Sequence, residues 1–259
     1  MASEREIQAM RRAIVLAGRG LGTASPNPVV GCVVLDGEGQ PAGEGWHERP
    51  GEPHAEVNAL RAAGDRARGG TAVVTLEPCN HYGRTPPCRL ALIEAGIARV
   101  VYAVTDPNPT AEGGGQALRN AGIQVEGGVL EHEAARVNEA WLTTTREHRP
   151  FVTWTRAEAD DDRSAVIGEL LTAQPMTREQ LRAQSDAIIV SAKTSSPAPT
   201  LRETVNGPRP QQILYAGDPQ ALLATLPERG ILSVLIKDDP ALAHAFLAAG
   251  LVDRINPEQ

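Results

Sequence analysis

Hydrophobic positions in the first 150 residues switch between a helical spacing and short β-branched runs, which predicts alternating helices and strands. The apolar side chains within Glu6–Ala17 share one helical face, and Val29–Leu35 is typical of a buried strand followed by a glycine-rich turn. Further helices are predicted at Ala55–Ala63, Arg89–Ala95, Gly115–Asn120 and Glu133–Leu142, and further strands at Thr71–Leu76, Arg99–Val104 and Ile123–Val125. Strands separated by helices indicate an α/β layer architecture with parallel strand pairs.

The chain after Pro150 shows the same α/β pattern with weaker signals. Its segment Ser195–Pro210 holds four prolines and one glycine, and we expect a loop there. Strands are predicted at Phe151–Thr155, Ala187–Val190, Gln212–Tyr215 and Leu232–Ile236, and helices at Thr177–Gln184 and Pro240–Ala249. We therefore expect two domains, at residues 1–147 and 150–259.

Composition narrows the class of protein. The 259 residues are 41% hydrophobic and 22% charged, as in an ordinary globular protein. Apolar runs fall far short of the ~20 residues of a membrane span, and Met1–Arg12 has no signal-peptide pattern. The net charge of −7, with no Lys before residue 150, argues against nucleic-acid binding. Three cysteines make a poor disulfide framework and favour a reducing, cytoplasmic location.

All three cysteines and five of the six histidines precede residue 150, so candidate chemistry concentrates in the first half. His54, Cys79 and Cys88 offer one imidazole and two thiolates, which suit Zn²⁺ and leave its fourth position open for water. Zinc acidifies such a water, and Glu56, two residues after His54, is placed to carry its proton to a leaving nitrogen. A His-x-Glu followed by Pro-Cys is typical of zinc deaminases.

Each element of this pattern is weak by itself. His-x-Glu is common by chance, and two cysteines separated by eight residues can be small buried hydrophobes. Together, a His-x-Glu that begins a helix and a Pro-Cys that follows a strand are far more specific. Cys32, inside a predicted strand with no partner motif, is interpreted as a core residue.

These motifs closely resemble the deaminase half of the bifunctional deaminase/reductase family of riboflavin biosynthesis, over about residues 4–147. The eight-residue spacing between the cysteines separates this family from cytidine and tRNA deaminases, which carry a shorter Cys-x-x-Cys form. The resemblance rests on Met10–Ala13, Ser25–Gly31, Gly45–His47, His54–Leu60, Thr75–Cys79, His81–Cys88 and Asp106–Pro109.

The resemblance implies a three-layer cytidine-deaminase-like domain with a mixed sheet. It also implies hydrolytic deamination of 2,5-diamino-6-ribosylamino-4(3H)-pyrimidinone 5′-phosphate, a pyrimidine ribonucleotide, to 5-amino-6-ribosylaminouracil 5′-phosphate and ammonia. In that reading Glu56 is catalytic, and one zinc per chain is held by the ligands named above. The implied substrate-binding residues are Asn27, His47, His81, Arg84, Asp106 and Asn108, with Arg84 on the phosphate.

Simpler roles stay open for several of these residues. Asp106 and Asn108 precede prolines and could be turn residues alone. Arg84 could be a solvated surface charge, and His47 could be structural. His132 and His148 match no motif and are expected at the surface.

Residues 150–259 resemble the family's NADPH-dependent reductase domain, which has a dihydrofolate-reductase-like α/β fold, but key positions differ. Thr155 replaces a lysine, and Ala159–Arg163 replaces the family's Ser-Leu-Asp-Gly-Arg run, so that its Asp-Gly turn has become Asp161-Asp162. Lys237-Asp238-Asp239 replaces Glu-Gly-Gly, which removes a close backbone approach and adds carboxylates beside a phosphate position. The segment is also about half the family's length. We therefore expect a reduced, degenerate domain that binds no NADPH and supports packing or an oligomer interface.

The leading hypothesis is a deaminase that needs a separate reductase for the next step. A duplicated copy that deaminates a related pyrimidine or purine in specialised metabolism is a second hypothesis, and a non-catalytic partner of a reductase is a third. The intact substrate-binding motif favours the first over the second, and the intact zinc ligands and Glu56 argue against the third.

Overall fold

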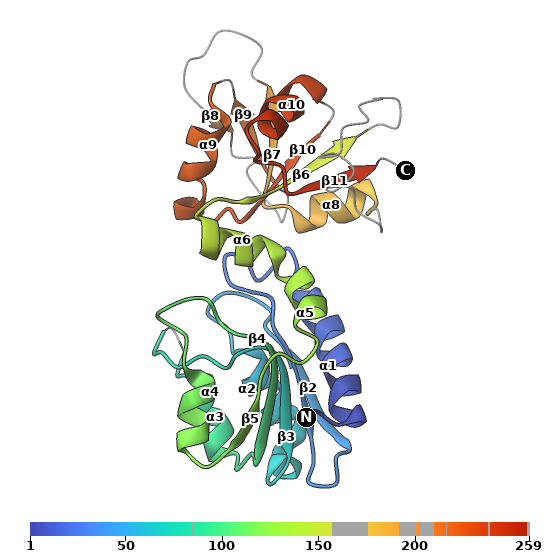
Figure 1. The fold of residues 1–259 in the computed structure, drawn as a ribbon, viewed down its shortest axis with the longest axis vertical. Coiled ribbons are helices and arrows are strands. Elements are labelled where there is room, and N and C mark those ends of the chain that lie inside the picture. The colour runs from blue at the N-terminus through green and yellow to red at the C-terminus, as the bar shows by residue number, and fades with distance from the viewer. Residues whose placement is uncertain are drawn as a thin grey trace. The chain divides into compact units, whose positions relative to one another are not determined.

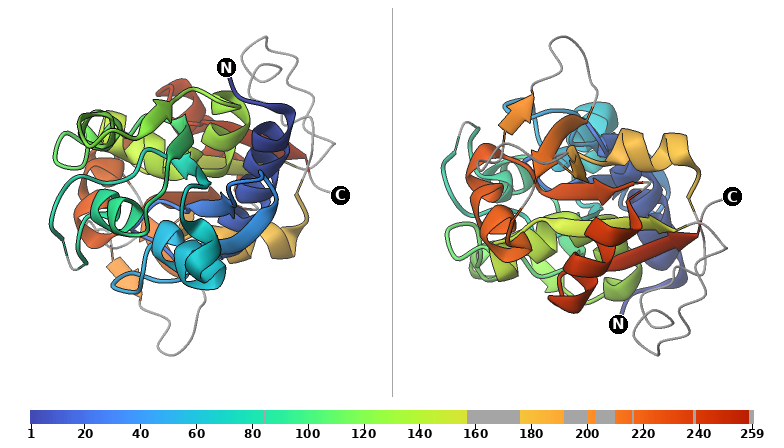
Figure 2. Two further views of the ribbon diagram at one scale, coloured as in Figure 1. Left: turned by 90° about the horizontal axis from the view of Figure 1, so that it is seen from below. Right: turned by 90° about the horizontal axis from the view of Figure 1, so that it is seen from above.

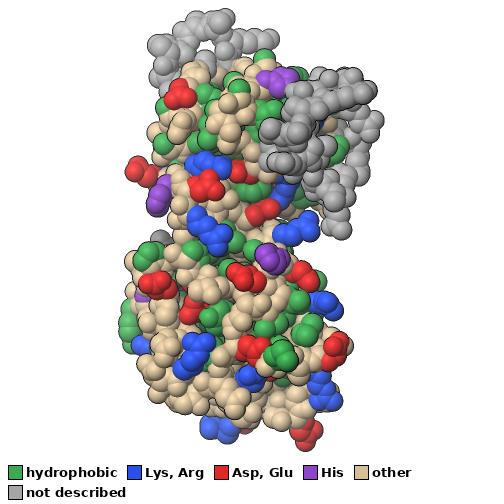
Figure 3. All heavy atoms as spheres, viewed as in Figure 1, with side chains coloured by type: hydrophobic (Ala, Val, Ile, Leu, Met, Phe, Trp, Pro, Cys, Tyr) green, Lys and Arg blue, Asp and Glu red, His purple; other side chains and the backbone are tan. Residues whose placement is uncertain are grey.

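A computed structural model describes residues 1–83, 85–156, 176–191, 200–202, 210–215, 217–237 and 239–257. The chain forms two compact units, Met1–Leu142 and Thr143–Gln259. The path of the chain through each unit can be followed in Figures 1 and 2. Within the described residues, no helix has the length and apolar character that crossing a membrane requires. On the face seen in Figure 3, acidic and basic side chains are interspersed.

The first unit is built on a five-stranded mixed sheet with strand order β2-β1-β3-β4-β5. Strand β1 pairs antiparallel with both β2 and β3, whereas β3, β4 and β5 run parallel, which confirms the predicted mixed sheet. The strands are β1 (Gly31–Leu35), β2 (Pro41–Trp46), β3 (Thr71–Leu76), β4 (Arg99–Val104) and β5 (Gln124–Glu126).

Helices cover both faces of this sheet and form two separate hydrophobic clusters. Buried residues of α1 (Glu4–Ala17) and α5 (Glu131–Val137) pack on one face. Those of α2 (Ala55–Ala63), α3 (Cys88–Glu94) and α4 (Gly114–Asn120) pack on the other. The result is the three-layer arrangement implied by the resemblance.

Strand β2 was not predicted, because its sequence, Pro-Ala-Gly-Glu-Gly-Trp, contains no β-branched residue. The structure shows why glycine is needed there. A Cβ on Gly43 would lie 2.3 Å from the Ala59 carbonyl oxygen, and one on Gly45 would lie 2.4 Å from the Ala59 amide nitrogen. Helix α2 therefore packs directly against the strand backbone, and tertiary packing overrides the low strand propensity.

The helix predicted at Glu133–Leu142 is instead two helices, α5 and α6 (Glu139–Glu147), separated at Asn138. The buried Asn138 side chain accepts from the Val29 amide at 2.8 Å and donates to the Val29 carbonyl at 2.7 Å. This long-range pairing with backbone is invisible in the local pattern. Helix α1 also begins earlier than predicted, because Ser3 forms a capping box with Glu6.

The second unit contains a six-stranded sheet with strand order β11-β6-β10-β7-β9-β8. Its strands run parallel except β8, which pairs antiparallel with β9. The strands are β6 (Phe151–Arg156), β7 (Ala187–Ser191), β8 (Thr200–Arg202), β9 (Gln211–Tyr215), β10 (Ser233–Ile236) and β11 (Arg254–Pro257), and the helices are α8 (Arg178–Gln184), α9 (Pro219–Thr225) and α10 (Pro240–Ala248).

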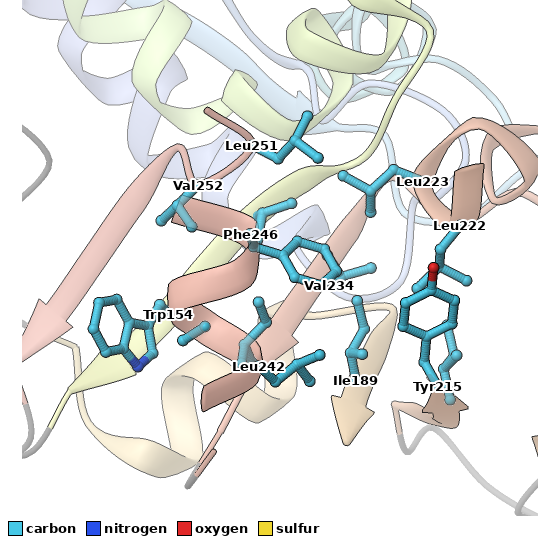
Figure 4. Close-up of a cluster of buried hydrophobic side chains, with 14 of the residues drawn as sticks. Trp154, Ile189, Tyr215, Leu222, Leu223, Val234, Leu242, Phe246, Leu251 and Val252 are labelled. Carbon is cyan, nitrogen blue, oxygen red and sulfur yellow. The ribbon is translucent and has the colours of Figure 1, made fainter. Parts of the chain in front are cut away.

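Two short helical turns at Gly18–Gly20 and Gly64–Ala67 complete the first unit, and Pro227–Arg229 forms one in the second. The expectation of a loop throughout Ser195–Pro210 was wrong at β8, where strand pairing with β9 overrides the proline-rich local signal. Helix α9 and strand β11 were also missed. Phe246 of α10 is fully buried in the core of this unit, together with Val234 of β10 and Leu251 (Figure 4).

Candidate metal centre and active site

Three side chains that are far apart in sequence converge at one end of the first sheet. His54 immediately precedes α2, Cys79 follows β3, and Cys88 is the first residue of α3. One ligand atom from each lies within 4.8 Å of the other two. The structure thus brings together the three predicted metal ligands.

The donor types of this cluster, one imidazole nitrogen and two sulfurs, fit zinc. His54 Nδ1 lies 3.1 Å from Cys88 Sγ and 3.7 Å from Cys79 Sγ. Tetrahedral zinc with ordinary Zn–N and Zn–S bonds sets such atoms roughly 3.5–3.8 Å apart, a spacing that the Cys79 pair has and that the Cys88 pair falls short of. The other ring nitrogen of His54, Nε2, lies 3.4 Å from Thr85 Oγ1, a contact that would orient the ring from outside the metal shell.

The electrostatics favour a thiolate at Cys79. A hydrogen bond from the Cys88 thiol is the largest influence on the pKa of Cys79, and with the contact to His54 it outweighs burial and lowers that pKa to about 4. The Cys88 amide also donates to Cys79 Sγ at 3.3 Å. A sulfur that is already anionic is the form that binds a metal.

Glu56 lies two residues after His54, at the second position of α2, and the residue is 3% exposed. Burial raises the pKa of Glu56, and the neighbouring Cys79 raises it further. A carboxyl group with a raised pKa, next to a metal site, suits proton transfer in both directions.

His54, Cys79 and Glu56 line a cavity of about 460 Å³ in the first unit. Five of the six predicted substrate-binding residues line it, and the sixth, Arg84, lies outside the described residues. The five are Asn27, His47, His81, Asp106 and Asn108.

His47 and Asn27 are linked at the cavity wall. Asn27 Nδ2 donates to His47 Nε2 at 3.0 Å, and His47 Nδ1 lies 3.3 Å from the Pro53 carbonyl oxygen, which it can reach only as a donor. Burial lowers the pKa of His47, which favours the neutral form of the ring. His47 therefore bonds to the surrounding chain and also faces the cavity, so its position is compatible with both the structural and the substrate-binding role.

Asp106 and Asn108 make turn bonds while lining the cavity. Asp106 Oδ1 accepts from the Asn108 amide at 2.9 Å, and Asn108 Oδ1 accepts from the Thr110 amide at 3.1 Å. Burial raises the pKa of Asp106 to about 6, with a contribution from the charge of Glu77. The turn role proposed for these residues is thus confirmed, and it orders the loop that faces the cavity.

Several lining residues were missed among the candidates. Glu52, Thr85 and Trp141 line the cavity from loops and a helix whose approach only the fold reveals. Glu77 also lines it, and its position directly after a buried strand and two residues before a ligand was a usable signal. Cys32 is fully buried in β1, and His132 and His148 are exposed, as predicted.

A deaminase-type zinc site is the class that this sheet, donor set and carboxyl group define. The family model of the cytidine and deoxycytidylate deaminase zinc-binding region matches residues 3–104. Among curated proteins, a riboflavin biosynthesis protein RibD of Mycobacterium tuberculosis H37Rv is 39% identical over 282 residues, covering 96% of this chain and 83% of the relative. The chain belongs to the RibD family.

Other relatives support the same assignment over different lengths. RibD of Escherichia coli K12 is 47% identical over 202 residues, and the match spans 74% of this chain but only 55% of that protein. The solved structure of Acinetobacter baumannii RibD, form 1, has a TM-score of 0.79 at 34% identity and covers 97% of this chain and 85% of that one. A Thermotoga maritima deaminase/reductase gives 0.75 at 30% identity, covering 95% of this chain and 84% of its own. Both units therefore have the RibD fold.

Proposed function

We propose that this protein catalyses the zinc-dependent hydrolytic deamination of 2,5-diamino-6-ribosylamino-4(3H)-pyrimidinone 5′-phosphate in riboflavin biosynthesis. The observation that carries the proposal is the cluster of His54, Cys79 and Cys88 beside a cavity that His54, Cys79 and the buried Glu56 line. The name of the Thermotoga relative includes the corresponding pyrimidine deaminase activity. The products are 5-amino-6-ribosylaminouracil 5′-phosphate and ammonia.

Glu56 carries the protons of the reaction. Bound zinc supplies Lewis acidity that makes water nucleophilic near neutral pH. The Glu56 carboxylate would accept a proton from the attacking water and then donate it to the departing amino group, which regenerates the carboxylate. Water adds its oxygen to the ring carbon as the carbon–nitrogen bond breaks, and ammonia leaves.

The cavity wall holds the pyrimidine ribonucleotide. Asn27, His81 and the neutral His47 offer hydrogen-bonding groups to the pyrimidine and ribose. Asp106 and Asn108 present oxygens that can accept from substrate amino or hydroxyl groups. Arg84, outside the described residues, is proposed to bind the phosphate, because a guanidinium pairs well with phosphate oxygens.

The test is ammonia release from the diaminopyrimidine phosphate by the zinc-loaded chain and by Glu56→Ala. We expect release by the unsubstituted protein, a loss of about 10²–10⁴-fold in the variant, and equal zinc in both, because all three ligands remain. Equal rates in the two proteins would contradict the role of Glu56. A zinc-loaded protein that releases no ammonia would favour a different pyrimidine or purine substrate.

We further propose that the second unit has no reductase activity and binds no NADPH, so that a separate reductase acts next. Thr155 stands where relatives carry lysine, and its hydroxyl donates to the Ile236 carbonyl at 3.4 Å. The Asp239 carboxylate accepts from the Ser191 and Leu242 amides. Asp160–Arg163, residues 192–199 and Asp238 lie outside the described residues. Saturable quenching of protein fluorescence by NADPH would overturn this proposal. A cytoplasmic location and a homo-oligomer stay predictions.

A further inference from the structure

Glu77 is a buried carboxylate in the first unit to which the proposed chemistry assigns no role. It directly follows β3, it is only 6% exposed, and it lines the cavity. No Arg, Lys or His among the described residues forms an ion pair with it. Burying a carboxylate without a cation is costly unless its oxygens accept hydrogen bonds, so its actual partners are informative.

The two oxygens of Glu77 bind the two ends of one loop. Oε2 accepts from the Asp106 amide at 3.3 Å, just after β4. Oε1 accepts from the Gly115 amide at 2.8 Å, in the first turn of α4. The segment between these amides, residues 106–115, contains Asp106 and Asn108, both of which line the cavity. One side chain therefore fixes the start and the end of a substrate-facing loop.

Glycines allow the loop to approach this closely. A Cβ on Gly114 would lie 1.7 Å from the Pro78 carbonyl oxygen, and one on Gly115 would lie 3.1 Å from Glu77 Oε1. The Asn80 amide adds a third attachment, donating to the Ala111 carbonyl at 3.1 Å. Glu77 and Asn80 lie on either side of Cys79 in the sequence, and both bond to the backbone of the loop at residues 106–115.

We propose that Glu77 is a positioning residue, which clamps residues 106–115 so that Asp106 and Asn108 are held at the cavity wall for the substrate. The inference rests on the proposed deaminase function for its effect on substrate, but the clamp itself concerns only this chain. Because Glu77 acts by accepting two N–H groups, the isosteric glutamine is the sharpest substitution. A Gln side chain keeps one acceptor and turns an NH₂ group toward the second amide, so only one end of the loop stays bound.

The first experiment is residue-resolved hydrogen exchange on the full chain, unsubstituted and with Glu77→Gln. The matched control is Glu112→Gln, an exposed glutamate in the same loop. We expect exchange at the Asp106 or Gly115 amide to rise about tenfold or more in Glu77→Gln and to stay unchanged in the control. Unchanged exchange at both amides in Glu77→Gln would overturn the clamp.

The second experiment measures the kinetics of ammonia release. Glu77→Gln should raise KM about tenfold with kcat changed less than about threefold, because loop order contributes to binding substrate and transition state alike. In an Asp106→Ala background, Glu77→Gln should add little further change, since both substitutions remove the same interaction. Fully additive effects, or an unchanged KM with equal zinc, would overturn the positioning role. Absence of ammonia release by the unsubstituted protein would instead contradict the proposed function, and hydrogen exchange would still decide the clamp.

Discussion

Three buried polar side chains of the first unit face a cavity, whereas Asn256 and Asp186 of the second unit bond to the chain's own backbone. Glu56, Asp106 and His47 are all buried, and all three line the 460 Å³ cavity. In the second unit, the fully buried Asn256 binds the Met176 amide and carbonyl, and Asp186 accepts from the Leu232 and Ser233 amides. The polar groups of the second unit hold its loops together.

The two units therefore share an α/β architecture, while these polar side chains make different contacts in each. Both units have sheets covered by helices and dense hydrophobic cores, and relatives with both units superpose on 95–97% of the chain. Packing thus conserves the architecture of both units, and activity depends on which side chains are placed at the strand ends. The following substitutions test the contrast, beginning with the largest expected effect.

Removing a metal ligand should abolish the function of the first unit. Cys88→Ser should lose tightly bound zinc and lower ammonia release by at least about 10³-fold, because two ligands cannot hold a catalytic zinc with the same affinity. Metal analysis and the ammonia assay measure both effects. Cys32→Ala, which alters a buried cysteine of β1 away from the ligands, is the control and should keep its zinc. Zinc loss in both variants would contradict the ligand assignment.

Opening the core of the second unit should affect stability without touching the metal. Phe246→Ala removes a fully buried ring and should lower the free energy of unfolding of that unit by about 3–5 kcal/mol. Denaturant unfolding and zinc content are the measurements. Leu247→Ala, at a partly buried neighbour, should cost less. A large loss of zinc from folded Phe246→Ala protein would contradict the expectation that the second unit does not affect zinc binding in the first.

Weakening the cavity wall should affect substrate binding selectively. Asn27→Ala removes the donor to His47 Nε2 and should raise KM for the diaminopyrimidine phosphate about tenfold with zinc retained. Steady-state kinetics measure the effect. Asn120→Ala, at the exposed end of α4, should behave like the unsubstituted protein. An unchanged KM in Asn27→Ala would remove Asn27 from the substrate-binding set.

The smallest expected effect concerns acid stability of the first unit. Burial alone would raise the pKa of Glu6, but hydrogen bonds from Arg99, at 2.6 Å, and from Ser3 outweigh it and lower the pKa below 4.5. A lowered pKa stabilises the fold above about pH 4.5, and this contribution is lost as the pH falls through the folded-state value. Glu6→Gln should cost about 1–2 kcal/mol at pH 7 and less in acid, measured by denaturant unfolding at several pH values. Exposed Glu4→Gln should show little change, and an equal cost at every pH would contradict this account.

Sequence reasoning selected three candidate zinc ligands that the structure brings together, because their spacing and residue types are chemically restrictive. It also gave Ala55–Ala63, Thr71–Leu76 and Arg99–Val104 with the observed bounds, since these segments combine strong periodicity with clear ends. It missed strand β2, whose glycines are explained only by the helix packed on them.

The same limit explains what was missed at the site. Asn138 interrupts a helix through bonds to Val29, 109 residues away, and Glu77 holds amides 29 and 38 residues away. No local pattern encodes such partners, because each depends on how the sheet brings distant segments together. Motifs therefore identify the reacting groups, and the fold identifies the groups that position them.

The most direct test of the contrast is to incubate the zinc-loaded chain with the diaminopyrimidine phosphate and NADPH together, and to identify the products by mass spectrometry. The account predicts 5-amino-6-ribosylaminouracil 5′-phosphate with one ammonia released per molecule converted and no NADPH consumed. Recovery of unchanged substrate with zinc bound would contradict the activity of the first unit. A reduced product with oxidation of NADPH would contradict the inactivity of the second.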